Sequence, residues 1–226
     1  MPRALRTVLV DIDGTLIDSN DAHTRAWLEV LARHDRERSY DAIRPLIGMG
    51  GDKLLAATLG PSADAIDANA LGNERGALFL SRELHQLKPT RGARELLEKL
   101  HAAGLHVVVA TSAKAQETDA LLRQAGLDDL IDRAADSDDV NGSKPDPDII
   151  QAALRKSGTP PSEAVMLGDT PYDIEAARKA GVAPIVLRCG GWWNDDAFTG
   201  AVAIYDDPAD LIQAFDDSPL NPVAST

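Results

Sequence analysis

The stretch VLVDIDGTLID, residues 8–18, places aspartates directly after a short apolar run. Residues 8–10 have the apolar character of a buried strand, and Asp11 and Asp13 follow them one residue apart. Like charges beside a hydrophobic core repel one another unless something offsets them. The stretch therefore predicts either a solvated polar turn or a site where a positive charge lies between the carboxylates.

Outward from this stretch, apolar strand-like runs alternate with helix-like segments over most of the chain. One helix is expected to start with Asp146 as its N-cap and Pro147 as its first residue. Strands joined by helices call for a parallel sheet. We predict an α/β fold, a doubly wound (Rossmann-like) parallel sheet with helices on both faces. The further expected strands are LHVVVA (105–110), DLIDRAA (129–135), EAVMLGD (163–169), APIVLRC (183–189) and one near 201–205.

Residues 18–87 have helical character and contain no convincing strand. Within them Trp27, Val30, Leu31 and His34 recur at helical spacing, which gives one helix a packing face. An all-helical stretch fits best as an insertion after the first strand. The predicted domains are an α/β core (1–17 and 88–216), a helical cap (18–87) and a frayed tail (217–226).

Composition limits the range of functions. Of the 226 residues, 44% are hydrophobic and 26% are charged, as in ordinary soluble proteins. No apolar run reaches the roughly 18 residues needed to cross a bilayer, and the start is too short in apolar length for a signal peptide. Cys189 is the only cysteine, so a reducing compartment, the cytoplasm, is expected. The net charge of −13 disfavours nucleic acids and membranes as partners but permits a small anionic substrate.

Polar side chains follow the strands at the edge where a parallel sheet binds its ligands. Lys144 lies in the loop before a helix. Three carboxylates without a cation would raise one another's pKa, whereas Mg²⁺ takes oxygen ligands and leaves positions for water and phosphate. We therefore predict Mg²⁺ as the cofactor at this edge. The side chains just past the strands are Asp11 and Asp13, Thr111 and Ser112, and Asp169.

Four segments together resemble the motifs of one known family. DIDGT (11–15), ATSAK (110–114), SKPDPDI (143–149) and LGDTPYD (167–173), in this order, are similar to the four motifs of the haloacid dehalogenase (HAD) superfamily of phosphotransferases. The resemblance covers nearly the whole chain and includes a helical cap of the C1 type. It implies a phosphatase, a Mg²⁺-dependent enzyme that hydrolyses the phosphomonoester of a small metabolite through an aspartyl-phosphate intermediate.

Within this resemblance, Asp11 matches the nucleophile that receives the phosphoryl group. A carboxylate suits that role because it is ionised at neutral pH without an activating base. Asp13 matches the general acid/base, and its backbone carbonyl would also bind Mg²⁺. The dehalogenases of the superfamily lack an aspartate at this position and use no metal. Asp11 together with Asp13 and Asp169 therefore indicates phosphate chemistry rather than halide displacement.

The remaining motif residues match groups that hold phosphate and metal. Thr111 and Ser112 would bind the phosphoryl oxygens, and Lys144 would neutralise the nucleophile and the developing phosphoryl charge. Asp169 would ligate Mg²⁺ directly, and Asp173 would act through water or through Lys144. The implied metal set is Asp11, Asp13, Asp169 and Asp173.

Most of these residues also have a purely structural interpretation. The paired aspartates could form a solvated turn, and Lys144 could be a lysine exposed to solvent. Thr111 and Ser112 could cap the next helix. Asp173 lies three residues after Thr170, a spacing that fits a capping box at a helix start.

The cap carries two weaker resemblances. LIGMGGDKLL (46–55) is similar to the cap loop of phosphoglycolate phosphatases, which implies that Lys53 faces the active site and meets a substrate carboxylate. DAHTRAW (21–27) is similar to the hinge segment of β-phosphoglucomutase-like enzymes, which implies that His23 lies near the general acid. A surface lysine and a structural histidine are the alternatives. The mutases have an arginine in the cap loop where this chain has two glycines, so a clamp for a second phosphate is missing.

The substrate is left open between phosphoglycolate and a sugar phosphate. The alternatives to a phosphatase are a phosphosugar mutase, a phosphonate hydrolase with Lys53 as a Schiff base, and a non-catalytic binding module of the same fold. The chain is either a monomer or a homodimer. Trp192 and Trp193 are expected to pack or to form a subunit contact rather than to stack on substrate.

Overall fold

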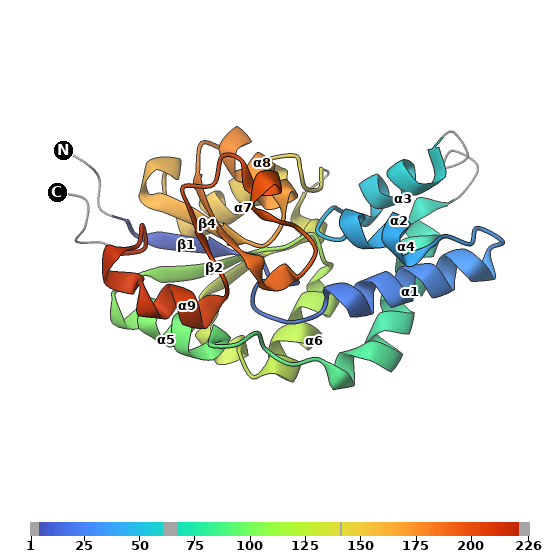
Figure 1. Cartoon of the computed structure of the whole chain (residues 1–226), viewed down its shortest axis with the longest axis horizontal. Helices are drawn as coiled ribbons and strands as arrows, with labels where there is room; N and C mark the ends of the chain where they lie inside the picture. Colours follow the sequence, from blue (N-terminus) through green and yellow to red (C-terminus); the bar gives the residue numbers. More distant parts are fainter. Residues whose placement is uncertain (1–4, 61–66, 141, 222–226) are drawn as a thin grey trace.

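The computed structural model describes residues 5–60, 67–140 and 142–221. In this part of the chain, six parallel strands form one sheet in the order β3-β2-β1-β4-β5-β6 (Figure 1). This topology confirms the predicted α/β fold with a doubly wound parallel sheet. The strands are β1 (Thr7–Val10), β2 (His106–Ala110), β3 (Arg133–Ala135), β4 (Ala164–Gly168), β5 (Ala183–Leu187) and β6 (Ala203–Tyr205).

Helices cover both faces of the sheet because neighbouring strand residues point into different apolar clusters. Val8 and Val10 of β1 share one cluster with α5, α6 and α9, whereas Leu9 shares the other with α7 and α8. Because β1 is central and fully buried, the aspartates after it open at the middle of the sheet's carboxyl edge. These helices are α5 (Ala93–Ala102), α6 (Ala115–Ala125), α7 (Asp148–Ser157), α8 (Pro171–Lys179) and α9 (Pro208–Gln213).

Four further helices lie together beyond the carboxyl edge of the sheet (Figure 1). They are α1 (Asn20–Arg33), α2 (Tyr40–Ile43), α3 (Gly51–Leu59) and α4 (Ala68–Leu78). We call residues 18–87 the cap. In α1, Trp27, Val30 and Leu31 are buried, as the periodicity predicts. The prediction that His34 belongs to the packing face is wrong, because its ring is exposed at the helix end and forms a hydrogen bond with Glu74 at 2.8 Å.

Two segments join the cap to the core, and they run side by side. Ile17 pairs with Pro89 in an antiparallel bridge, and the Asp18 N–H donates to the Lys88 carbonyl at 3.0 Å. The predicted boundaries at 17/18 and 87/88 fall within this paired connection. The division of the chain into two domains stays a prediction.

Near the C-terminus, packing continues beyond the boundary predicted for a frayed tail at residue 217. Ser218 and Leu220 are buried, and Leu220 belongs to the main apolar cluster. No helix in the described ranges combines the length and the hydropathy needed to cross a bilayer. Residues outside the described ranges are 1–4 of the predicted core, 61–66 of the predicted cap, 141 and 222–226.

The loop after β5, RCGGWW (188–193), packs the cap against the core. The Trp192 ring lies 6.5 Å from the Tyr40 ring and 5.9 Å from the guanidinium of Arg44. Trp193 meets Tyr172 edge to face at 6.3 Å. Of the two roles expected for these tryptophans, the contacts support packing, and a subunit contact stays a prediction.

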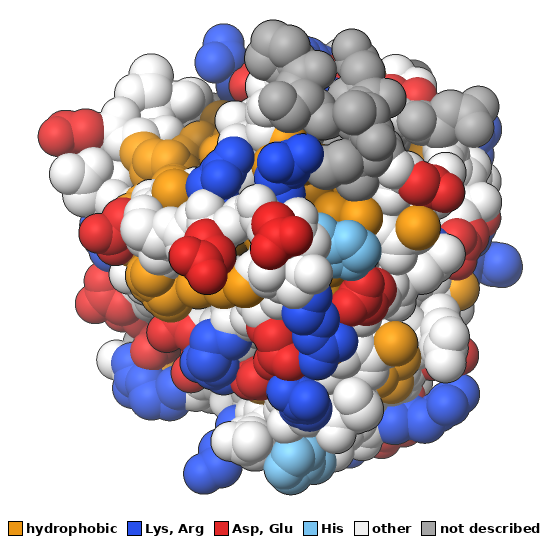
Figure 2. Space-filling model, turned by 90° about the vertical axis from the view of Figure 1, so that its right-hand side faces the viewer, with side chains coloured by type: hydrophobic (Ala, Val, Ile, Leu, Met, Phe, Trp, Pro, Cys, Tyr) orange, Lys and Arg blue, Asp and Glu red, His pale blue; other side chains and the backbone are white. Residues whose placement is uncertain are grey.

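The outer face of the cap carries interleaved acidic and basic side chains, with apolar side chains scattered between them (Figure 2). Glu29 pairs with Arg33 and, at 2.7 Å, with Arg82. Arg33 also pairs with Glu74 at 3.1 Å. Neighbouring charges of opposite sign therefore offset one another on this face.

Candidate active site

The first functional pair joins the end of β1 to the loop before α7. The Lys144 ammonium lies 2.5 Å from Oδ1 of Asp11 and 2.8 Å from Oδ1 of Asp173. All three side chains are buried. A buried ammonium requires carboxylate partners of this kind, so the alternative of a solvent-exposed Lys144 is excluded. The lysine is placed to neutralise negative charge on Asp11.

Asp169, which follows β4, is held by groups from three other segments. Its Oδ1 accepts from the Thr15 hydroxyl at 3.2 Å, and its Oδ2 accepts from the Asn20 amide at 2.9 Å. Gly14 and Gly190 pack so closely on this carboxylate that a Cβ on either would overlap it, and Gly14 also has φ +78°. Glycine at both positions therefore lets the backbone enclose Asp169.

The buried carboxylates carry more negative charge than the protein balances. Oxygens of Asp11, Asp169 and Asp173 lie within 4.8 Å of one another, beside the single ammonium of Lys144. Burial raises the pKa of Asp11 to about 7 against the opposing charge of Lys144, with Asp173 and Asp13 adding to the rise. Burial, together with Asp173 and Asp11, raises the pKa of Asp169 well above its usual range. A hard divalent cation would offset this excess, so the donor set fits Mg²⁺.

Asp173 is committed to other contacts. Its Oδ2 accepts from the Thr170 N–H at 3.1 Å and from the Thr170 hydroxyl at 2.6 Å, in a capping box at the start of α8. Its Oδ1 faces Lys144. The predicted capping box is confirmed. The contact with Lys144 agrees with the indirect role expected for Asp173, and direct ligation of a metal by Asp11 and Asp169 stays a prediction.

The Asp13 carboxylate points away from this cluster, toward the cap. Its Oδ1 accepts from the Ser19 hydroxyl at 2.5 Å and from Nε2 of His23 at 2.7 Å. Because the Arg75 guanidinium can only donate, its 3.2 Å contact with Nδ1 of His23 leaves the ring proton on Nε2. Arg75 also donates to both carboxylate oxygens of Glu117 at 2.9 Å. A chain of contacts thus runs from Asp13 through the cap to α6.

These contacts set the environment of Asp13. Burial alone would raise the pKa of its carboxyl, but the neighbouring His23, the Ser19 hydrogen bond and the Arg75 charge hold that pKa below its usual value. The His23 ring also stacks on Phe79, with the ring centroids 4.0 Å apart. His23 is therefore fixed in orientation as well as in tautomer.

Thr111 and Ser112 follow β2 but do not cap the next helix. Helix α6 begins at Ala115 with Lys114 at the N-cap position, and the Thr111 hydroxyl accepts locally from the Ala113 N–H at 3.1 Å. The Ser112 hydroxyl is buried and has no hydrogen-bond partner among the described residues. An unpaired buried hydroxyl is costly. Ser112 lines a small cavity of about 40 Å³, which Asp11 and Asp13 also line.

With this geometry, the comparisons with known proteins identify the family. Residues 5–181 match the model of the haloacid dehalogenase-like hydrolases. The chain belongs to this family. It is 34% identical over 221 residues to a phosphoglycolate phosphatase of Rhodospirillum rubrum, covering 93% of this chain and 90% of that one. An N-acetylmuramic acid 6-phosphate phosphatase of Pseudomonas aeruginosa is 30% identical over 223 residues, covering 94% and 95%.

A crystal structure of a hydrolase from Pseudomonas syringae superposes with a TM-score of 0.85 at 32% identity, covering 94% of this chain and 98% of that one. The family and the fold class predicted from the sequence are therefore confirmed. The roles predicted for individual residues stay predictions, supported by where the structure places them.

In this HAD-like hydrolase, Lys53 lies elsewhere than predicted. Its ammonium pairs with the carboxylate of Asp146, in the loop before α7, and it lines neither cavity at the site. The same pair explains a wrong helix boundary, because Asp146 contacts the cap instead of capping α7, which begins at Asp148 after Pro147. The arrangement gives no support to a substrate contact by Lys53.

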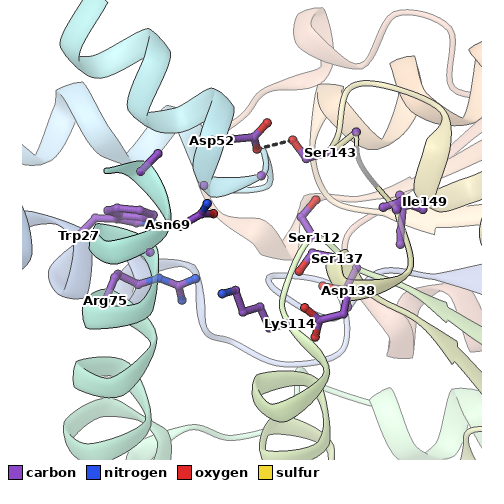
Figure 3. Close-up of a pocket in the computed structure, with 17 residues that line it drawn as sticks. Trp27, Asp52, Asn69, Arg75, Ser112, Lys114, Ser137, Asp138, Ser143 and Ile149 are labelled. Carbon is purple, nitrogen blue, oxygen red and sulfur yellow. Dashed lines mark hydrogen bonds between the residues drawn. The ribbon is translucent and has the colours of Figure 1, made fainter. Parts of the chain in front are cut away.

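A larger cavity of about 330 Å³ lies between the cap and the core of the hydrolase (Figure 3). It adjoins the small cavity, because Trp27, Gly51, Arg75, Thr111 and Ser112 line both. In Figure 3, the cap residues lie on one side, opposite the loops that follow β2 and β3. The larger cavity therefore lies where the organic part of a substrate would be if its phosphate lay beside Asp11.

Sequence reasoning missed Asn20, Arg75 and Glu117. Asn20 reaches Asp169 only because the chain folds back between β1 and α1. Arg75 and Glu117 meet across the boundary of cap and core, 42 residues apart in the chain. No motif contains these three residues, so no local signal marked them.

Proposed function

We propose that this chain is a Mg²⁺-dependent phosphomonoester hydrolase that acts on a small phosphorylated metabolite. The observation that carries the proposal is the buried Asp11, in contact with Lys144 and open to a cavity that the unpaired Ser112 hydroxyl also lines. The predicted phosphatase activity is confirmed at the level of the family and its relatives named as phosphatases. The residue roles below are our assignment.

In the first half-reaction, a carboxylate oxygen of Asp11 attacks phosphorus, and the bond from phosphorus to the leaving alcohol breaks. Lys144 offsets the negative charge that the attacking carboxylate and the phosphoryl oxygens bring together. Ser112 donates its unpaired hydroxyl to a phosphoryl oxygen. Thr111 contributes its backbone beside the same cavity.

Asp13 handles the proton in both half-reactions. Among the described residues, Ser19 and His23 both donate to Oδ1 of Asp13, which leaves Oδ2 to give a proton to the leaving alcohol. A phosphoryl dianion beside Asp13 favours the protonated form during this step. After the alcohol leaves, the ionised carboxylate, with its lowered pKa, accepts a proton from the water that attacks phosphorus. The bond from phosphorus to the Asp11 oxygen then breaks, which regenerates the Asp11 carboxylate and releases inorganic phosphate.

Asp11 and Asp169, with the backbone carbonyl of Asp13, are the groups we assign to Mg²⁺. When bound, the ion supplies positive charge that balances the buried carboxylates and draws electrons from the phosphoryl group. Asp173 takes part by fixing Lys144. Thr15 and Asn20 orient Asp169.

The rival functions have less support. Gly50 and Gly51 stand where a mutase would have its arginine clamp, and a Cβ on Gly50 would already overlap Ser143. A phosphonate hydrolase would need Lys53 at the reacting carbon, but Lys53 pairs with Asp146 outside both cavities. A non-catalytic module would have no use for the unpaired Ser112 hydroxyl beside Asp11.

The test is the release of inorganic phosphate from para-nitrophenyl phosphate, which needs no specific leaving-group contacts. Activity should require Mg²⁺, vanish after chelation and return when Mg²⁺ is restored. Activity that persists after exhaustive chelation would contradict the metal assignment. No hydrolysis of any phosphomonoester with Mg²⁺ present would contradict the proposal itself.

A further inference from the structure

The larger cavity between cap and core has room for more than a two-carbon leaving group. Its volume of about 330 Å³ lies within the range of pockets that enclose small organic ligands, roughly 300–1,000 Å³. A glycolyl group would leave much of this space to water. Volume alone therefore favours a leaving group with more atoms, next to the phosphate position.

The walls of this cavity offer several polar groups that lack partners. The exposed side-chain amide of Asn69 and the half-buried hydroxyl of Ser137 make no hydrogen bond within the described parts of the chain. Ser112 differs from them because its unpaired hydroxyl is buried. In Figure 3, Asn69 projects from α4 into the cavity, opposite Ser112 and Ser137. Unpaired donors and acceptors on facing walls suit a ligand with hydroxyl groups on several sides.

Among the described residues, the charges of the walls balance. These residues line the cavity with the cations Arg75 and Lys114 and with the anions Asp52 and Asp138. All four side chains make contacts within the protein. Arg75 is held by Glu117, and Lys114 donates to Asn73 at 2.6 Å. Asp52 accepts from the Ser143 hydroxyl at 2.6 Å and Asp138 accepts from the Ala115 N–H at 3.0 Å, each through one oxygen, so the other oxygen of each carboxylate is left for a ligand. A carboxylate or a second phosphate on the leaving group would therefore meet carboxylates on the walls as well as cations.

Apolar surface completes the cavity. Trp27 of α1 lines it on the cap side, and Val140 and Ile149 line it on the core side. The lining as a whole is more polar than apolar, so these three side chains form limited apolar walls among polar groups. The C–H faces of a sugar ring would pack on such walls while its hydroxyls reach the polar groups.

We propose that this cavity binds a neutral, polyhydroxylated leaving group of sugar size, held by Asn69, Ser137 and the carboxylates of Asp52 and Asp138. The inference rests on the proposed function, since it places the phosphate of such a substrate beside Asp11. It names the substrate class as monophosphates of pentoses or hexoses, in preference to phosphoglycolate. Asn69 is then a residue that determines specificity.

The test compares kcat/KM for a panel of hexose and pentose monophosphates with the values for 2-phosphoglycolate and para-nitrophenyl phosphate. The best sugar phosphate should exceed 2-phosphoglycolate by about tenfold or more, the worth of one or two added hydrogen bonds. In Asn69→Leu, the ratio of kcat/KM for that sugar phosphate to kcat/KM for the aryl phosphate should fall by about tenfold. Asn194→Leu, which changes an exposed amide in the loop after β5, is the matched control and should keep the wild-type ratio.

A binding experiment separates this inference from the proposed function. Calorimetry with Asp11→Asn and Mg²⁺ needs no turnover, and it should show tighter binding of the sugar phosphate than of 2-phosphoglycolate. Failure to hydrolyse the aryl phosphate counts against the proposed function, whereas the calorimetric order tests the cavity directly. Binding of 2-phosphoglycolate as tight as that of the sugar phosphate, or tighter, would overturn the inference. So would a loss of 2-phosphoglycolate binding in Lys114→Ala, because that loss would show that the cavity recognises an anionic leaving group. So would an unchanged substrate ratio in Asn69→Leu.

Discussion

At the scale of single residues, the two aspartates after β1 have different neighbours, so their substitution should have different effects on activity. Asp11 faces Lys144, whereas Asp13 faces His23 and Ser19. Asp11→Asn should abolish both phosphate release and the trapping of labelled phosphate on the protein. Asp13→Asn should slow turnover by roughly 10²–10⁴-fold, the usual worth of a positioned acid/base. Steady-state assays and acid-quenched labelling measure both, and label on any residue other than Asp11 would show that the nucleophile is misassigned.

The raised pKa of Asp11 and Asp169 predicts a link between Mg²⁺ and pH. A carboxyl whose pKa is higher in the folded protein than in the unfolded chain binds its proton more tightly when folded. The metal-free protein should therefore lose stability as pH rises from about 4, the unfolded value, through the folded value of about 7. Mg²⁺ replaces those protons, so it should raise Tm more at pH ~8 than at pH ~5. Scanning calorimetry at the two pH values is the measurement, and an equal shift at both would count against this linkage.

At the scale of elements, the start of α8 combines helix capping with the placement of Lys144. Thr170 caps the helix and also holds the Asp173 carboxylate that faces Lys144. Thr170→Ala should lower the free energy of unfolding by about 1 kcal/mol and also reduce kcat. Asp207→Ala, which removes the N-cap of α9 far from the site, should have a comparable effect on stability without lowering kcat. Urea unfolding measures the stability of the two variants, and phosphate release measures their kcat. Full activity in Thr170→Ala would contradict the prediction that Thr170 helps to place Lys144.

The elements also show how far the sequence could predict this molecule. Asp11, Thr111 and Asp169 were found because apolar strands mark where each polar side chain must emerge. The predicted start of α7 is wrong because the side chain of Asp146 pairs with Lys53, 93 residues earlier in the chain, instead of capping the helix. Local patterns therefore predict what lies on one strand end, but not which distant segment packs against it.

At the scale of the whole molecule, the cap contacts the core through pairs whose loss should affect all substrates alike. Lys53 pairs with Asp146 across this boundary, with both side chains partly exposed. Lys53→Ala should change kcat/KM for 2-phosphoglycolate and for an aryl phosphate equally, by no more than about fivefold. Lys179→Ala is the control, because Lys179 of α8 also lies near Asp146, at 3.8 Å, but belongs to the core. A rise in KM confined to 2-phosphoglycolate would restore the substrate contact predicted from the cap loop.

The paired connection at Ile17 and Pro89 has a consequence for how such proteins diversify. Both ends of the cap leave the core at neighbouring points, with the Asp18 N–H only 3.0 Å from the Lys88 carbonyl. The path of the core chain is thus nearly closed without the cap, and a short turn could complete it at little cost in loop entropy. One contiguous stretch of a gene therefore encodes the lid. A lineage could exchange that stretch and acquire a new substrate while it inherits the reacting groups around Asp11 unchanged.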